Sequence, residues 1–191
     1  MRQAGKQWRV KASLVAALLV SMGSVVTANE PEPAGYRMEN YRAPVPATLQ
    51  GAKVVSTAEA EALWKEKKAV FFDVMPHTPK PADLPEGTIW REQGRRNIPG
   101  SLWLANTGYG ALPEEVADHF AAALRDQTAQ DKARAILFYC MTDCWMSWNA
   151  AKRALELGYT SVLWYPHGAD GWERAGLPLE EGKPYLTGKG G

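Results

Sequence analysis

Apolar runs of strand length alternate with segments of helical periodicity through residues 53–176. Strands are predicted at residues 53–55, 69–74, 101–104, 133–139 and 161–165. Helices are predicted at residues 57–67, 113–125, 147–157 and 170–175. Strands that alternate with helices favour a parallel sheet covered on both faces. The pattern therefore predicts an α/β fold with a central parallel sheet of about five strands flanked by helices.

Local signals mark some helix ends and some segments outside the regular pattern. Ser56 followed by Glu59 forms a capping box, and Gly158 ends a helix. Residues 29–52 are a Pro-rich extension, residues 75–97 a long loop predicted to be functional or a packed Ω-type excursion, and residues 181–191 a Gly-rich tail. The domain itself is expected at residues 53–180.

The amino-terminal segment has the pattern of a signal peptide. An apolar stretch at residues 12–26 leads to small residues ending at Ala28. It follows four basic residues: Arg2, Lys6, Arg9 and Lys11. We expect residues 1–28 to be cleaved and the protein to be exported to the periplasm, an uncleaved membrane anchor being the alternative.

Cleavage would change the formal charge from +1 to −3 and leave 163 residues. That length fits one domain that buries its core without covalent staples. The chain has no basic stripe, so no nucleic-acid partner is expected. No membrane span is expected after signal cleavage.

The two cysteines, Cys140 and Cys144, share one loop between a predicted strand and the helix expected to begin at Ser147. Backbone N–H groups and the helix dipole at such a position favour a thiolate. A disulfide between residues four apart contributes little by loop closure, so the pair points to sulfur chemistry or to a static bond. The other predicted loop and pocket residues are Asp73, Met141, Thr142, Asp143, Trp145, Met146, Ser147 and His167.

Residues 53–180 carry an ordered set of matches that resembles the rhodanese fold. The set comprises Asp73-Val74, Asn97-Ile98-Pro99-Gly100-Ser101, the cysteine loop, Ala150-Ala151, Gly158-Tyr159, His167-Gly168 and Ala175-Gly176-Leu177-Pro178. The resemblance implies that Cys140 occupies the position of the catalytic cysteine that carries a persulfide. A narrower resemblance, on Cys140…Cys144-Trp145-Met146-Ser147-Trp148, is to exported proteins of the CXXCW-motif family associated with catabolism dependent on pyrroloquinoline quinone (PQQ). It implies a periplasmic redox or quinoprotein dehydrogenase system as partner.

The cysteine loop departs from the rhodanese pattern. That family's loop carries an arginine after the cysteine, whereas here the next arginine is Arg153. Without a guanidinium in the loop, a thiosulfate or phosphate anion lacks its main positive partner, which argues against ordinary thiosulfate sulfurtransferase and phosphatase activity. Three arginines in or next to the long loop at residues 75–97, the Pro-rich loop, are candidates to replace the missing loop arginine: Arg91, Arg95 and Arg96. A solvated surface position is nevertheless favoured for all three.

Several functions fit the loop. In the first, the Cys140 thiolate attacks a partner disulfide or sulfane donor and Cys144 resolves the product, as in a sulfurtransferase-like enzyme or a thiol–disulfide oxidoreductase. Helical spacing would place the two Cα atoms roughly 6 Å apart. In the second, Cys140, Cys144 and His167 bind Cu(I), with Met141 and Met146 as further soft donors. Our primary expectation is that the protein binds no metal or other cofactor, with Cu(I) as the alternative.

A third interpretation is a non-enzymatic module whose aromatic side chains, Trp145 and Trp148, hold a flat quinone or a segment of a quinoprotein dehydrogenase or its cytochrome partner. The simplest alternative is a static disulfide in a degenerate domain. Core packing is favoured for Trp64, Trp103, Trp164 and Trp172. Asp73 is expected to orient backbone in the loop after its strand.

Overall fold

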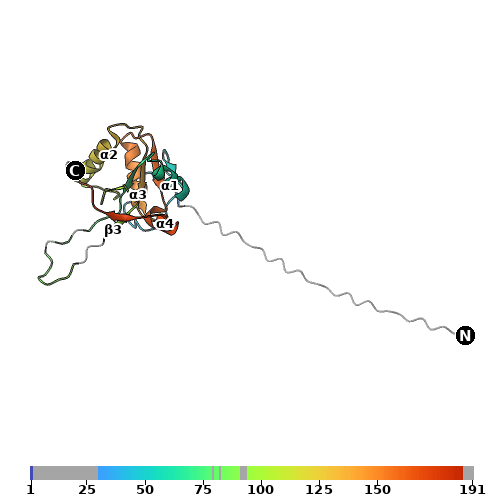
Figure 1. The fold of residues 1–191 in the computed structure, drawn as a ribbon, viewed down its shortest axis with the longest axis horizontal. Coiled ribbons are helices and arrows are strands. Elements are labelled where there is room, and N and C mark those ends of the chain that lie inside the picture. The colour runs from blue at the N-terminus through green and yellow to red at the C-terminus, as the bar shows by residue number, and fades with distance from the viewer. Residues whose placement is uncertain (2–29, 79, 82, 91–93, 187–191) are drawn as a thin grey trace.

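The computed structural model describes residue 1 and residues 30–186, except residues 79, 82 and 91–93. A five-stranded sheet in the order β1-β6-β5-β2-β4, parallel throughout, forms its centre (Figure 1). The strands are β1 (Lys53–Val54), β2 (Val70–Asp73), β4 (Leu102–Trp103), β5 (Ile136–Tyr139) and β6 (Val162–Tyr165). The predicted α/β fold with a parallel sheet of about five strands is thus confirmed.

Four helices cover the two faces of the sheet. They are α1 (Thr57–Lys65), α2 (Glu114–Thr128), α3 (Trp145–Glu156) and α4 (Gly168–Arg174). Alternate strand residues point to opposite faces, so Phe72 and Phe138 share a core with α2 and α3, whereas Phe71 and Leu137 share the other core with α1 and α4. Buried strands flanked by helices on both faces explain the continuous apolar runs in the sequence.

The predicted helices are all present, but several of their ends differ by two or three residues: α1 ends at Lys65, α2 ends at Thr128 and α4 begins at Gly168. The capping box of Ser56 and Glu59 is present at the start of α1. Helix α3, however, begins at Trp145 and not at Ser147, with Cys144 as its N-cap residue. The prediction was wrong by two residues because Trp145 and Met146 are drawn into the helix by burial against the core, which the local sequence does not encode.

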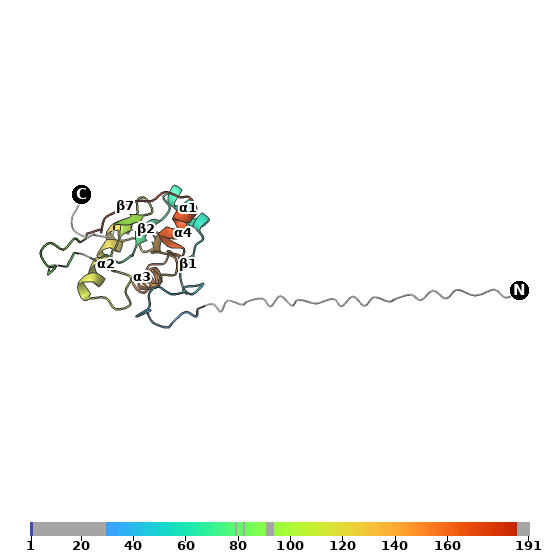
Figure 2. The same ribbon diagram turned by 90° about the horizontal axis from the view of Figure 1, so that it is seen from below.

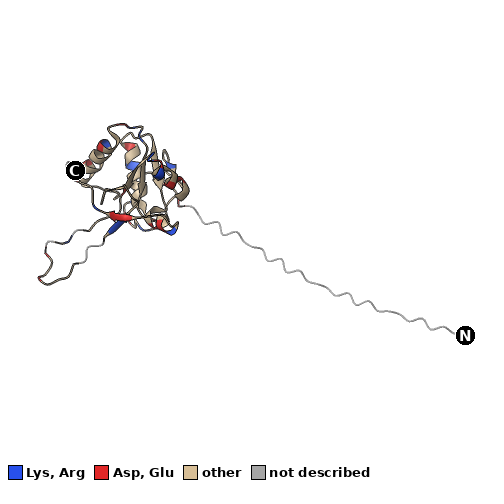
Figure 3. Ribbon diagram, viewed as in Figure 1, with Lys and Arg blue, Asp and Glu red and all other residues tan. Residues whose placement is uncertain are grey.

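A small two-stranded antiparallel sheet was not predicted. It pairs β3 (Arg95–Asn97), at the end of the Pro-rich loop, with β7 (Glu180–Gly182) in the segment expected to begin the tail. Figure 3 shows the basic β3 beside the acidic β7. Gly182 is required there because the Asn97 carboxamide occupies the space that a Cβ would fill. Residues 187–191 of the predicted tail lie outside the described residues.

The Pro-rich extension packs along α3, as Figure 2 shows for the segment that leads into the domain. Asn149 on α3 accepts a hydrogen bond from the Arg37 N–H at 2.9 Å and donates one to the Arg37 carbonyl at 2.9 Å. Trp148 donates from Nε1 to the Thr48 carbonyl at 3.2 Å. Residues 2–28 of the predicted signal peptide lie outside the described residues. Within the part described, no helix combines the length and apolarity needed to cross a membrane.

Candidate functional site

The cysteine loop lies at the carboxyl end of β5, the middle strand of the sheet. Cys140 follows β5 directly, and Cys144 is the N-cap of α3. The two form a disulfide, with Cα atoms 6.2 Å apart, close to the spacing expected from the sequence. Cys140 is 0% exposed and Cys144 2% exposed, so the disulfide is buried beneath the surface of the loop.

Two neighbouring elements hold the backbone of Cys140. Its carbonyl oxygen accepts a hydrogen bond from the Ala169 N–H at 3.0 Å and another from Arg95 Nη2 at 2.9 Å. Met141 pairs with Gly168 in an isolated antiparallel bridge. Gly168 has a φ of +59°, and a Cβ there would overlap the Met141 backbone. The first half of the loop is therefore fixed against the start of α4.

Asp73 is a fully buried carboxylate beside the loop. Arg95 donates to it from Nε at 2.7 Å and lies 2.6 Å away through Nη2, and the Asn97 amide donates at 3.0 Å. The Met75 N–H donates to Oδ1 at 2.8 Å, so Asp73 orients the backbone after its strand, as expected. Burial raises the pKa of Asp73 to about 6, although Arg95 and the Met75 N–H act in the opposite direction.

The arginines of the Pro-rich loop do not behave alike. The Arg95 side chain is 11% exposed and bridges Asp73 and the Cys140 carbonyl, so the expectation of a solvated surface was wrong for it. Arg96 is 61% exposed and pairs with Glu173, as expected for a solvated position. Arg91 lies outside the described residues. The difference arises because β3 alternates its side chains between the domain and solvent.

A second network ties Thr142 to α4. Its N–H donates to Asp170 Oδ1 at 2.7 Å, and its hydroxyl donates to the His167 carbonyl at 2.8 Å. Arg174 bonds both Asp170 and the Thr142 hydroxyl, at 3.1 and 2.9 Å. Partial burial favours the neutral acid, but the Thr142 N–H and Arg174 outweigh it and lower the pKa of Asp170. Asp143, between this anchor and Cys144, is exposed and has a φ of +53°.

The structure does not assemble the Cu(I) ligand set expected from the sequence. His167 is exposed, precedes α4, and places its ring 5.9 Å from that of Tyr165. Among the residues that the structure describes, no three His, Cys, Asp or Glu side chains are grouped as metal ligands. His167 bounds the loop through its backbone carbonyl and not through its imidazole.

The aromatic side chains of the motif are covered by the Pro-rich extension. The Trp145 N–H donates to the Tyr41 carbonyl at 2.9 Å, and its Nε1 donates to the Pro44 carbonyl at 3.0 Å. The Arg37 guanidinium lies 5.0 Å from the centre of the Trp145 ring system. Trp145 and Trp148 are both buried, so neither offers the open face that a quinone would need.

Most of the tryptophans expected to pack in the core do so, and two residues of the predicted pocket lie in helix α3. Trp103, Trp164 and Trp172 are buried, whereas Trp64 is half-buried. Met146 and Ser147 are buried in α3. The Ser147 hydroxyl accepts a hydrogen bond from Trp164 Nε1 at 3.0 Å and donates to the Cys144 carbonyl at 3.1 Å.

One site residue was missed by the sequence reasoning. Met75 places its Sδ atom 3.5 Å from Cys140 Sγ. Its backbone is held on both sides, because its N–H donates to Asp73 and its carbonyl accepts from Trp103 Nε1 at 2.7 Å. The signal that could have found it is topological: Met75 follows β2, and β2 neighbours β5 in the parallel sheet.

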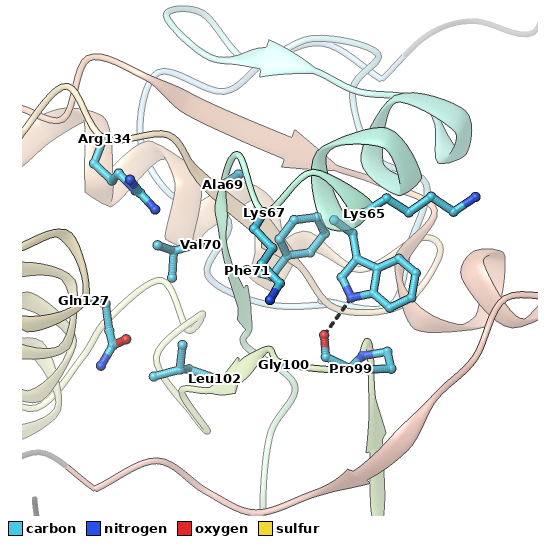
Figure 4. Close-up of a pocket in the computed structure, with 11 residues that line it drawn as sticks. Lys65, Lys67, Ala69, Val70, Phe71, Pro99, Gly100, Leu102, Gln127 and Arg134 are labelled. Carbon is cyan, nitrogen blue, oxygen red and sulfur yellow. Dashed lines mark hydrogen bonds between the residues drawn. The ribbon is translucent and has the colours of Figure 1, made fainter.

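A separate pocket lies at the amino-terminal ends of strands β2, β4 and β5 (Figure 4). Its volume is about 710 Å³, and its floor is mainly apolar. Val70, Leu102 and Arg134, at or before the amino ends of their strands, contribute to its lining. The cysteine loop follows the carboxyl end of β5, so this pocket does not belong to the disulfide site.

Residues 56–175 match the family model of the rhodanese-like domain. Similar solved structures include thiosulfate sulfurtransferase from Pseudomonas aeruginosa, with 18% identity, a TM-score of 0.43, and coverage of 70% of this chain and 21% of that one. The polysulfide-sulfur transferase homodimer from Wolinella succinogenes has 18% identity, a TM-score of 0.42, and coverage of 68% and 79%. The human single-domain sulfurtransferase has 21% identity, a TM-score of 0.39, and coverage of 64% and 96%. No curated protein matches this sequence.

Proposed function

The chain belongs to the rhodanese-like domain family, and from that premise we propose that it handles thiol–disulfide exchange or sulfane sulfur through Cys140 and Cys144. The observation that carries this proposal is the Cys140–Cys144 disulfide itself, in the loop after the middle strand of the sheet. Rhodanese-like domains place their reactive cysteine in that loop, and here a second cysteine lies within bonding distance of it. The pair can therefore store two electrons.

In the exchange reaction, a partner thiolate attacks Cys144 Sγ and the bond to Cys140 breaks. Cys140 leaves as a thiolate and takes a proton, and a mixed disulfide links Cys144 to the partner. A second thiolate of the partner then attacks the partner's sulfur atom in that mixed disulfide. This forms a disulfide within the partner and releases Cys144 as a thiolate. The partner becomes a disulfide and the pair is reduced by two electrons, so the atoms and electrons balance.

In the sulfane reaction, the reduced pair takes the terminal sulfur of a persulfide donor. A Cys144 thiolate attacks that sulfur and the donor leaves as a thiolate, which makes a persulfide on Cys144. Attack of Cys140 on the Cys144 Sγ atom releases hydrosulfide and forms the Cys140–Cys144 disulfide. Both reactions thus involve the same oxidised pair, and only the second produces sulfide.

The helix boundary favours Cys144 as the thiolate after reduction. Cys144 is the N-cap of a 12-residue helix whose first turn contains no acidic residue. A thiolate at that position is stabilised by free N–H groups and by the helix dipole. We therefore exchange the two roles suggested by the sequence: Cys144 attacks and Cys140 resolves.

The arginine nearest after the loop in sequence does not replace the missing anion ligand. Arg153 donates from Nη1 to the Thr107 carbonyl at 2.9 Å and from Nη2 to the Tyr109 carbonyl at 2.9 Å. Its guanidinium is thus engaged with the 107–110 segment. This supports a thiol or persulfide substrate over a sulfate-like anion such as thiosulfate.

The decisive measurement is the reduction potential of the pair in the protein that begins at Asn29, followed by mass spectrometry across a glutathione series. We expect a value in the range of catalytic dithiols, roughly −120 to −230 mV. A value below about −300 mV would mean a static disulfide and would overturn the proposal. Sulfide release from the reduced protein with glutathione persulfide then separates the two reactions, and Cys144→Ser is the control.

We extend the proposal to the compartment and pathway. The signal-peptide pattern and the resemblance of the Cys140…Cys144-Trp145 segment to the CXXCW-motif family support a periplasmic accessory of PQQ-dependent alcohol oxidation. The mature protein should then begin at Asn29 in a periplasmic fraction. A strain lacking the protein should grow slowly on an alcohol that a quinoprotein dehydrogenase oxidises and normally on an organic acid. Equal growth on both would contradict the pathway but not the sulfur chemistry.

A further inference from the structure

Three sulfur atoms gather where strands β2 and β5 end. Cys140 and Cys144 contribute two, and Met75 contributes a third, whose Sδ atom lies 3.5 Å from Cys140 Sγ. Met75 follows a different strand from the cysteines, so the cluster depends on the pairing of β2 with β5. In the disulfide form this contact has no S–H donor, which makes it a packing contact between two soft atoms.

The chemistry of this cluster is selective. Thiolate and thioether sulfur are the donors that Cu(I) prefers, whereas hard cations such as Mg²⁺ and Ca²⁺ take oxygen. We propose that the reduced protein binds one Cu(I) ion through Cys140, Cys144 and Met75. The proposal goes beyond the sulfur exchange described above, and its ligand set differs from the one that includes His167.

Two of the three donor residues, Met75 and Cys140, are already held by the fold. The Met75 backbone is fixed by Asp73 and Trp103, with hydrogen bonds of 2.8 and 2.7 Å. The Cys140 carbonyl is fixed by Ala169 and Arg95. Breaking the disulfide therefore leaves Cys140 and Met75 in place, and Cys144 moves only as its loop allows. Met75 is half-buried, so the copper ion reaches the cluster from that side.

Binding requires a dithiol reductant that transfers two electrons to the disulfide. The two thiols then release two protons as Cu(I) binds, and the ion with two thiolates and one thioether carries a net charge of −1. The Arg95 guanidinium is bonded to the Cys140 carbonyl but is also paired with Asp73, so this ion pair adds no net charge beside the centre. In the periplasm, the copper would be delivered to the reduced protein by a Cu(I) carrier or as a chelated Cu(I) ion.

The experiment uses the protein from Asn29 onward, reduced by dithiothreitol and desalted without oxygen. Cu(I) is titrated in competition with bathocuproine disulfonate, and the sulfur and nitrogen neighbours of copper are counted by X-ray absorption. Met75→Leu should weaken binding by about tenfold or more because one ligand is lost. Met141→Leu and His167→Ala are matched controls and should bind as the unaltered protein does.

Circular dichroism and disulfide formation on reoxidation establish that each variant is folded. An unchanged affinity in Met75→Leu would overturn the proposal, because copper would then bind to the cysteines alone. Weakened binding in His167→Ala, or nitrogen beside copper, would overturn it in favour of the histidine set. Absence of Cu(I) binding by the reduced protein would overturn it outright. The reduction potential, measured without copper, tests the sulfur exchange separately.

Discussion

Arg95 donates a hydrogen bond to the carbonyl oxygen of Cys140 at 2.9 Å, although the two residues are separated by 45 positions. The same guanidinium is paired with the buried carboxylate of Asp73. An arginine from outside the cysteine loop thus joins the ends of β2 and β5. It positions the backbone of the loop and leaves the loop itself without a cation aimed at a substrate anion.

Removal of Arg95 should destabilise the fold strongly. In Arg95→Gln the Asp73 carboxylate stays buried without its charged partner, which costs about 3 kcal/mol or more of unfolding free energy. Urea unfolding at pH 7 measures the change. Arg96→Gln is the matched control, since its side chain is exposed and its ion pair is worth at most about 1 kcal/mol. Equal losses in the two variants would contradict the bridging role of Arg95.

The raised pKa of Asp73 predicts a pH dependence of stability. Its folded pKa of about 6 exceeds the ordinary 3.8, so between these values the folded state binds more protons than the unfolded state. Stability from this group therefore falls as the pH rises from about 4 to 7. Asp73→Asn lacks this titration. The unfolding free energy of the variant minus that of the unaltered protein should therefore increase by roughly 2–3 kcal/mol as the pH rises from about 4 to 7. A difference independent of pH would assign the carboxyl group an ordinary pKa.

The two cysteines should titrate differently once separated. In Cys140→Ser, the Cys144 thiol at the N-cap of α3 should have a pKa below the ordinary value of about 8.5. In Cys144→Ser, the fully buried Cys140 thiol should titrate above that value. Thiolate absorbance against pH reports both without requiring access of a reagent. The reverse order would return the attacking role to Cys140.

Asn149 should hold the Pro-rich extension on α3. Its side chain bonds both backbone groups of Arg37 and donates to the Gly108 carbonyl at 3.0 Å. Asn149→Ala removes these bonds, and trypsin should then cleave after Arg37 and Arg42 at least several-fold faster. Lys152→Ala, a change on the same helix that leaves these hydrogen bonds intact, should cleave at the unaltered rate. Equal rates in all three proteins would show that other contacts hold the extension.

Local patterns along the chain were enough to predict the α/β class, the parallel sheet and the place of the cysteines. These features depend on local periodicity and on short-range signals such as the Ser56–Glu59 capping box, which survive without knowledge of the tertiary contacts. The position of Cys140 after a buried strand and Cys144 before a helix follows from the same local pattern, even though the helix began two residues earlier than predicted.

The surroundings of the disulfide could not be predicted from local patterns and became visible only in the folded protein. The β3–β7 pair joins polar segments about 85 residues apart that have no apolar alternation, so local pattern could not reveal it. The contacts of Arg95 and Met75 with Cys140 arise from strand order, and the cover over Trp145 comes from a segment 101 residues earlier. Each joins positions distant in sequence, and only the packing of the folded chain brings their side chains together.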